Sequence, residues 1–282
     1  MIRHFYFSCV KHCRLTCVSH AAFVLVVIIF ILPETSRAQI PFFTDDADTT
    51  GKGKFHFEFF NEQDILQRAL YPAKRQNTAN FKLNYGLTER IEIDADVPLL
   101  TIYNSKIASG NATGIGDTEL GVKYNFRKER ENSRLPAMSA VFYVEAPTGS
   151  TAKQLGSGVT DYWLYGVAQK SLTSRTKLRT NAGILFAGNT VTGVIGIRTT
   201  KGKVFTGNAS LVRHFTPKLK LGAELFGAVT SNFALSKGQL ETQVGDSYAL
   251  RENLAFVFGI VAGRFVASPR VGASLGFAYD FK

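Results

Sequence analysis

The chain has 282 residues, of which 45% are hydrophobic and 20% are charged, and its formal net charge is +11 at pH 7. This balance excludes a disordered chain and a helical membrane protein, and the length fits one large all-β domain. After Pro41 no run approaches the roughly 20 apolar residues that a spanning helix needs, so a mature chain in a membrane must cross it as strands. No basic cluster is interleaved with aromatic residues on one element, so nucleic acid is not expected as a partner.

The N-terminus is typical of a secretory signal peptide. An apolar run at 21–32 follows several basic residues and precedes Ser36 and Ala38, which predicts cleavage after Ala38 and removal of residues 1–38. Twelve apolar residues are too few for an uncleaved anchor helix. All three cysteines lie in the removed part, so no disulfide is expected in the mature chain. Residues 39–52 are predicted to be a periplasmic N-terminal segment, and residues 53–282 a β-barrel.

From Gly53 onward, apolar and polar side chains alternate in segments of about ten residues, which is the period of β-strands. In the segment 90–99, for example, Ile91, Ile93 and Val97 lie on one face, and acidic residues lie on the other. The pattern predicts twelve strands, at 53–62, 77–86, 90–99, 116–126, 136–146, 158–170, 176–188, 203–215, 218–230, 242–250, 253–262 and 270–281.

The connections between these strands alternate in length. Short turns alternate with longer loops at 63–76, 100–115, 147–157, 189–202 and 231–241, and the charged linker 127–136 is interpreted as a solvated periplasmic excursion. An even strand count with turns at one rim and loops at the other predicts an all-β transmembrane antiparallel up-and-down β-barrel of about 12 strands. Closure is required because strands in hydrocarbon must satisfy every backbone hydrogen bond among themselves.

A soluble β-sandwich or lipocalin-like barrel would show the same alternation, with the apolar face turned inward. The polar face decides between the two classes of protein, because here it carries charges at mid-strand. The apolar face is aromatic toward the strand ends, which is typical of the girdles of membrane barrels. The residues in question are Phe55, Tyr85, Tyr124, Phe126, Phe215, Tyr279 and Phe281.

An ordered set of motifs carries a family resemblance. The set comprises NYGLTER at 84–90 with IEIDADVPL, GIGD at 114–117 with TELGVKYNF, then FYVEAPTGS, TPKLKLGAELFGA and a last strand that ends in Phe281. In these motifs the chain resembles the outer-membrane transporter family named for the meta-pathway (MetA pathway) of phenol degradation. The resemblance implies an outer-membrane barrel that moves small, often aromatic molecules.

The partners follow from this location. We expect outer-membrane lipid and lipopolysaccharide around the barrel, and the barrel assembly machinery during its insertion. A small-molecule solute is the expected cargo. The last residue is Lys282, whereas substrates of the assembly machinery commonly end in an aromatic residue, here the penultimate Phe281.

The motif residues also have a local interpretation. Gly86 ends a strand, and its freedom at positive φ would ease a tight reversal. Gly114 and Gly116 open the next strand beside a long loop, where Asp117 can accept hydrogen bonds from loop amides. A phosphate cradle would need a helix to follow these glycines, and a strand follows instead.

Catalytic, metal and cofactor sites are not expected. His56 and His214 are the only histidines of the mature chain, which is too few for a metal site built on imidazole. His214 lacks a neighbouring serine, and its predicted position at the periplasmic end does not suit an outer-leaflet hydrolase. His56 is expected to point into the lumen as a satisfied polar residue.

The lumen is expected to hold charges of both signs. The acidic row on the third predicted strand, Glu92, Asp94 and Asp96, is the main candidate for ion selectivity, with Lys82 and Lys123 as its neighbours. The remaining candidates for lumen or selectivity roles are Glu119, Arg179 and Glu224. Complete pairing would make these charges structural, whereas incomplete pairing would leave a negative stripe that favours cations.

Three functions remain open on the sequence alone. A channel for small molecules is favoured by the charged interior and by the family resemblance. A structural or surface-interaction barrel without transport activity is the alternative. A barrel enzyme ranks third, because no Ser-His or Asp-His constellation is evident.

Overall fold

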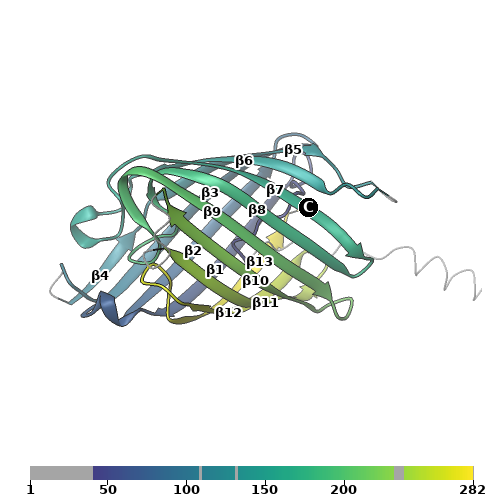
Figure 1. The fold of residues 1–282 in the computed structure, drawn as a ribbon. Coiled ribbons are helices and arrows are strands. Elements are labelled where there is room, and N and C mark those ends of the chain that lie inside the picture. Colours follow the sequence, from purple (N-terminus) through teal and green to yellow (C-terminus); the bar gives the residue numbers. More distant parts are fainter. Residues whose placement is uncertain (1–40, 108–109, 131–132, 232–237, 282) are drawn as a thin grey trace, which may run out of the picture. The chain divides into compact units, whose positions relative to one another are not determined.

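The computed structural model describes residues 41–107, 110–130, 133–231 and 238–281, and the predicted signal peptide lies outside the described residues. The described residues form one antiparallel sheet that closes on itself, as Figure 1 shows. Closure arises because β1 pairs with both β2 and β13, and β2 also pairs with β3. The strands are β1 (Phe55–Ile65), β2 (Arg75–Gly86), β3 (Ile91–Ser105), β4 (Gly110–Ile115), β5 (Thr118–Arg127), β6 (Ala137–Ala146), β7 (Asp161–Thr173), β8 (Thr176–Asn189), β9 (Arg198–His214), β10 (Lys220–Thr230), β11 (Gln239–Arg251), β12 (Leu254–Gly263) and β13 (Val271–Asp280).

Strands β4 and β5 together make one stave of the barrel. Both pair with β3, β4 over its second part and β5 over its first part. The interruption between them lies opposite Pro98, which has no N–H to donate to a neighbouring strand. The closed barrel therefore has twelve antiparallel staves, as the alternation predicts.

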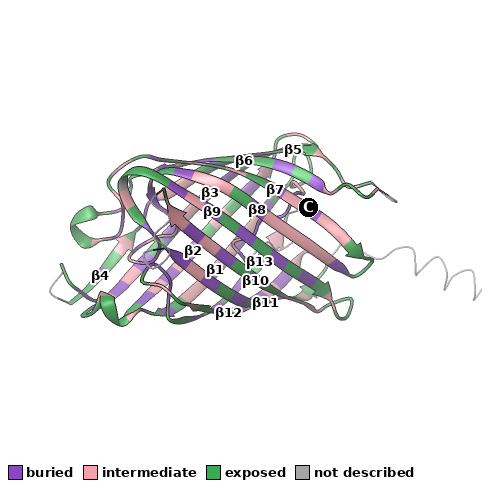
Figure 2. Ribbon diagram, viewed as in Figure 1, coloured by how far each residue is buried: buried purple, intermediate pink, exposed green. Residues whose placement is uncertain are grey.

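The two faces of the wall have opposite character. Exposed and buried residues alternate along the strands, as the colours of Figure 2 show. Ile93, Val122 and Leu275 point outward and are 41%, 44% and 57% exposed, whereas Asn125 and Ser274, one position along from outward-facing residues, are buried in the lumen. Most of the predicted aromatic girdle also points outward, including Phe55, Tyr124, Phe126, Phe215 and Phe281. The predicted register of apolar-outward strands is confirmed.

Several predicted loops are shorter in the structure. The predicted loop 100–115 is wrong, because β3 continues to Ser105 and β4 begins at Gly110. Leu100, Ile102 and Ala112 of this hairpin are buried against Leu155 and Ile195 at the loop end of the barrel. The strands extend there because inward apolar side chains find partners among the loops, which alternation within a single strand does not reveal.

Short turns gather at one end of the barrel, where β1 begins and β13 ends, and the longer connections lie at the other end. We call the lumen near the turns the inner half and the lumen near the longer loops the outer half. The longer connections contain two short 3-10 helices, η1 (Arg68–Leu70) and η2 (Thr151–Lys153). No helix of the described residues is long and apolar enough to cross a membrane.

Part of the charged linker 127–136 is held to the wall of the barrel. Glu129 is ion-paired with Lys170 and accepts hydrogen bonds from the backbone N–H and the hydroxyl of Ser171 on β7. Burial alone would raise the pKa of the Glu129 carboxyl, but the hydrogen bonds from Lys170 and Ser171 outweigh it and lower this pKa. The linker is therefore less freely solvated than the sequence suggests.

Candidate functional site: an occupied lumen

The stretch 43–50, which precedes the first strand, lies inside the barrel. Thr44, Asp45, Asp46 and Ala47 are all buried. The backbone N–H groups of Phe43 and Thr44 donate to the Glu224 carboxylate of β10, at 3.0 and 2.6 Å. The prediction that residues 39–52 lie in the periplasm is thus corrected for this part of the chain. The alternation of the strands cannot reveal such a contact, because the segment has no period of its own.

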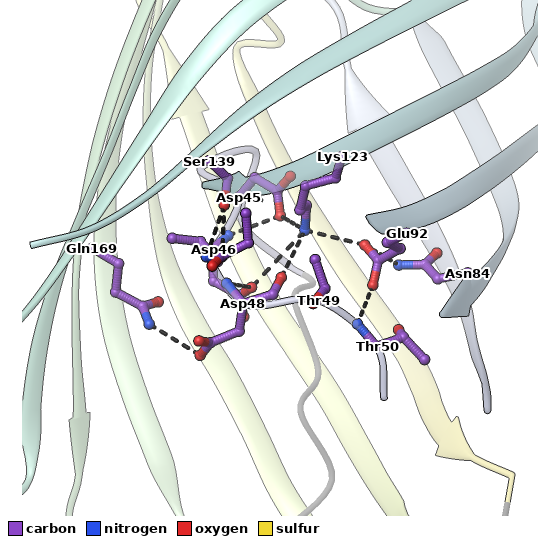
Figure 3. A network of polar contacts seen from close by, with 12 residues as sticks. Asp45, Asp46, Asp48, Thr49, Thr50, Asn84, Glu92, Lys123, Ser139 and Gln169 are labelled. Atoms are coloured by element: carbon purple, nitrogen blue, oxygen red, sulfur yellow. Dashed lines mark hydrogen bonds and ion pairs between the residues drawn. The ribbon is translucent and has the colours of Figure 1, made fainter. Parts of the chain in front are cut away.

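Lys123 of β5 joins the inserted segment to the wall. Its ammonium group lies 2.9 Å from the carboxylate of Asp45 and 3.2 Å from that of Glu92, and the side chain is 1% exposed (Figure 3). Asp46 lies 4.0 Å from the same ammonium group and 3.5 Å from the guanidinium of Arg179 on β8. A cation buried this deeply requires such carboxylate partners, since an unpaired charge in the interior is costly.

Further side chains of the wall bind the middle and the end of the segment. The Ala47 carbonyl accepts hydrogen bonds from Asn125 at 2.5 Å and from Ser139 at 2.7 Å. The Thr50 N–H donates to Glu92 at 2.5 Å (Figure 3). Between Phe43 and Thr50 none of the described hydrogen bonds joins main chain to main chain, so lumen side chains hold this segment in place of strand pairing.

Gly86 permits the segment to leave the barrel beside β2. A Cβ atom at this position would lie 2.2 Å from the Gly51 carbonyl oxygen and 2.4 Å from that of Thr50. Gly86 is absent from the residues of positive φ among the described backbone, so the predicted role in a left-handed turn is wrong. Close approach of the chain before β1 is what requires glycine in this motif.

A loop crosses the outer half of the lumen. The connection 190–197 between β8 and β9 reaches β2, where the Val194 N–H donates to Gln76 at 2.8 Å and Gln76 donates to the Thr192 carbonyl at 3.0 Å. Thr190 donates to Gln239 of β11 at 2.6 Å. The predicted long loop at 189–202 is therefore folded across the barrel, since it contacts strands on several sides.

Four carboxylates lie side by side around the outer half of the wall. Asp96 of β3 is the cross-strand partner of Glu119 on β5, Glu119 is the partner of Glu145 on β6, and Glu145 is the partner of Asp161 on β7. We call these four residues the acidic row. None of them forms an ion pair within 4.0 Å among the described residues. Like charges directly opposite one another are unfavourable, so this arrangement costs stability.

Asp117, next to the interruption between β4 and β5, accepts hydrogen bonds from a loop. Its carboxylate accepts hydrogen bonds from the backbone N–H groups of Gly149 at 2.9 Å and of Ser157 at 2.5 Å. The expectation that Asp117 bonds to loop amides is confirmed.

A cavity of about 190 Å³ lies between the inserted segment and the loop 190–197. One water molecule needs roughly 10–15 Å³ of such space, so the cavity has room for a small organic molecule. Apolar and aromatic side chains line part of it, namely Phe42, Phe43, Phe60, Trp163, Val191 and Ile195. Its carboxylates include Glu62, Asp64, Asp96 and Glu119, and Lys82 is also among its lining residues.

The predicted selectivity residues have different surroundings in the structure. Glu92, Lys123, Arg179 and Glu224 contact the inserted segment or its partners. Asp94 accepts a hydrogen bond from the Tyr143 hydroxyl at 3.0 Å, and Asp96 accepts one from Asn80 at 2.9 Å. Lys82, Asp96 and Glu119 line the cavity. Sequence reasoning missed Glu62, Asp64 and Asp161. Glu62 and Asp64 lie two positions apart on β1, and Asp161 becomes a neighbour of Glu145 only through the cross-strand register.

His56 pairs with two carboxylates in the lumen. His56 contacts Glu58 at 3.1 Å and Asp280 at 2.6 Å, and is buried in the lumen as expected. Among the described residues, no group of three or more His, Cys, Asp or Glu side chains has the geometry of a metal site.

Comparison with known proteins supports the architecture. The model of the family described as MetA-pathway of phenol degradation matches residues 41–281. The chain belongs to this family. None of the curated proteins matches the chain. The family match begins before β1, so it includes the inserted segment as well as the barrel.

Several solved structures share the fold. The COG4313 outer membrane channel from Pseudomonas putida F1 superposes with a TM-score of 0.60 at 15% identity, covering 84% of this chain and 98% of that one. The KdgM porin in complex with disordered oligogalacturonate has a TM-score of 0.53 at 15% identity, covering 80% and 99%. The NanC porin has a TM-score of 0.52 at 10% identity, with the same coverage. At these identities the likeness concerns the fold, which is that of outer-membrane barrels.

Proposed function

We propose that this protein is an outer-membrane channel for small, apolar or aromatic molecules, exported with a cleaved signal peptide and surrounded by outer-membrane lipid and lipopolysaccharide. The permeation path would run through the lumen. In the present state, the segment 43–50 occupies its inner half and the loop 190–197 crosses its outer half. The family membership and the fold of known channels support this proposal.

One observation carries the proposal. The segment that fills the inner half is bound by side chains of the wall and has no strand pairing between Phe43 and Thr50. It can therefore leave the lumen without breaking the hydrogen bonds that close the barrel, which a wall strand cannot do. A removable element inside a closed polar barrel suits a path that opens and closes better than it suits a purely structural barrel.

Solute uptake into proteoliposomes tests the proposal. A variant that lacks residues 41–50 is expected to admit small neutral solutes faster than the full mature chain, because the inner half of its lumen is unoccupied. Both proteins are first shown to be folded by their heat-dependent mobility in gels, and liposomes without protein give the background rate. If the folded deletion variant admits solutes no faster than the empty liposomes, the barrel is not a channel and the structural role becomes the better account.

A further inference from the structure

The carboxylates of the cavity outnumber the cations available to them. Glu62 and Asp64 lie two residues apart on β1 and therefore point to the same face, into the cavity. Asp64 is completely buried, and neither oxygen of its carboxylate accepts a hydrogen bond from an N–H or hydroxyl group of the described residues. The ionisable groups that act on Asp64 are two further carboxyls: Glu62, whose side chain is close enough to share a proton with it, and Glu241. A buried carboxylate among carboxylates lacks the donors that such groups normally have.

Strands β3 and β5 bring two more carboxylates to the same cavity. Asp96 and Glu119 belong to the acidic row and line the same cavity. Neither Asp96 nor Glu119 forms an ion pair within 4.0 Å among the described residues. The cavity is thus lined by more carboxyl groups than basic groups.

Beside its carboxylates and neutral polar groups, the cavity has an apolar and aromatic part, which limits the class of ligand. Phe42, Phe43, Phe60 and Trp163 line the same cavity as the acidic groups. Aromatic faces attract organic cations as well as apolar groups, whereas a bare hydrated metal ion would gain little from them. The described acidic groups also lack the geometry of a metal site. A molecule with an apolar body and one ammonium group would satisfy both parts of the lining.

We propose that the cavity binds a small protonated amine with an apolar or aromatic body, its ammonium group against Glu62 and Asp64. This inference rests on the proposed function, because a site within the permeation path selects what the channel carries. The ammonium group supplies N–H donors and a positive charge to the Asp64 carboxylate. An anionic molecule of the same shape is disfavoured by the same carboxyl groups.

Trp163 is the only tryptophan of the chain and lines the cavity, so its fluorescence reports on binding. Purified mature protein in detergent is titrated with three molecules of the same aromatic body: phenethylamine, 2-phenylethanol and phenylacetate. Phenethylamine is expected to bind about tenfold more tightly than the alcohol, which is the effect of one charge-assisted hydrogen bond, and phenylacetate least tightly. Ca²⁺ is included as a competitor.

Asp64→Asn is expected to reduce the affinity for phenethylamine about tenfold and to leave the affinity for 2-phenylethanol unchanged. Glu252→Gln removes an exposed carboxylate in the turn between β11 and β12 and is the matched control, which should bind like the wild type. Glu62→Gln provides the same test if the Asp64 variant does not fold.

Equal affinities for amine and alcohol in the wild type, or an unchanged preference in folded Asp64→Asn, would overturn the inference. Displacement of the amine by a more tightly bound Ca²⁺ would also overturn it and make the site a metal site. The fluorescence titration measures binding alone, so its outcome is independent of transport. An amine that binds but never enters proteoliposomes contradicts the channel, whereas uptake without preference for the amine contradicts only the present inference.

Discussion

The inner and outer halves of the lumen differ in how their charged side chains are paired. In the inner half, Lys123 lies within 3.2 Å of both Asp45 and Glu92, and backbone N–H groups complete the carboxylates. In the outer half, four carboxylates of the acidic row are cross-strand neighbours without an ion pair among the described residues. The paired charges of the inner half thus stabilise the fold, whereas the neighbouring carboxylates of the outer half destabilise it and leave a surface rich in acidic groups.

The inner half gives the largest expected effect. Lys123→Met removes the buried cation and leaves the carboxylates of Asp45 and Glu92 without it, so the free energy of unfolding should fall by about 3–5 kcal/mol. Urea unfolding in detergent or liposomes measures this change. Lys52→Met, at an exposed position before β1, is the control and should have almost no effect. Similar losses in the two variants would show that Lys123 is not the centre of the inner half.

The next test compares the same substitution in the two halves, beginning with the inner one. Glu92→Gln weakens the bonds that this carboxylate makes with Lys123 and with the Thr50 N–H. Because these bonds involve a charged acceptor, we expect a loss of about 1.5–3 kcal/mol in the free energy of unfolding. Urea unfolding measures it, and a loss no greater than that of an exposed Glu→Gln change would contradict the pairing.

In the outer half the same substitution should have the opposite sign. Glu145→Gln removes a charge that lies between Glu119 and Asp161, and each such like-charged contact is worth roughly 0.2–1 kcal/mol. The free energy of unfolding should therefore rise slightly, since the repulsion decreases. If the variant is destabilised as much as Glu92→Gln, the acidic row is paired after all and the contrast between the halves fails.

A small effect is expected outside the lumen, at the linker. The lowered pKa of Glu129 means that its ion pair stabilises the protein above the ordinary carboxyl pKa of 4.5 and that this contribution is lost as the pH falls through the lowered pKa. Glu129→Gln should cost about 0.2–1 kcal/mol at neutral pH and nothing in strong acid. Parallel unfolding curves at the two pH values test this, and a cost that is independent of pH would contradict it.

The sequence predicts the wall of the barrel well, and its interior less well. Side-chain alternation assigns Val122 and Leu275 outward because it is a property of each strand alone. The acidic row depends on the register between strands, which brings Glu145 next to Asp161 although they are 16 residues apart. No pattern in one strand contains that information.

The inserted segment was missed for a different reason. Residues 43–50 have neither a strand period nor a helical one, and their contacts with Glu224 lie about 180 residues away in the sequence. Three aspartates within four positions, Asp45, Asp46 and Asp48, were the available signal. Together with the buried lysine and arginine of the wall, they mark a segment that neutralises the inner half. Gly86 is a second signal, since its lack of a side chain indicates that another part of the chain approaches it closely. A turn is the simpler explanation of a glycine at the end of a strand, however.

Single-channel conductance in planar bilayers tests most directly whether the segment 43–50 obstructs the inner half of the permeation path. The mature wild type and a variant without residues 41–50 are compared at the same salt concentration, after both are shown to be folded. We expect a small conductance for the wild type and a several-fold larger, cation-preferring one for the variant, because the acidic row then faces an open lumen. Equal conductance in the two proteins, or none in either, would contradict the account.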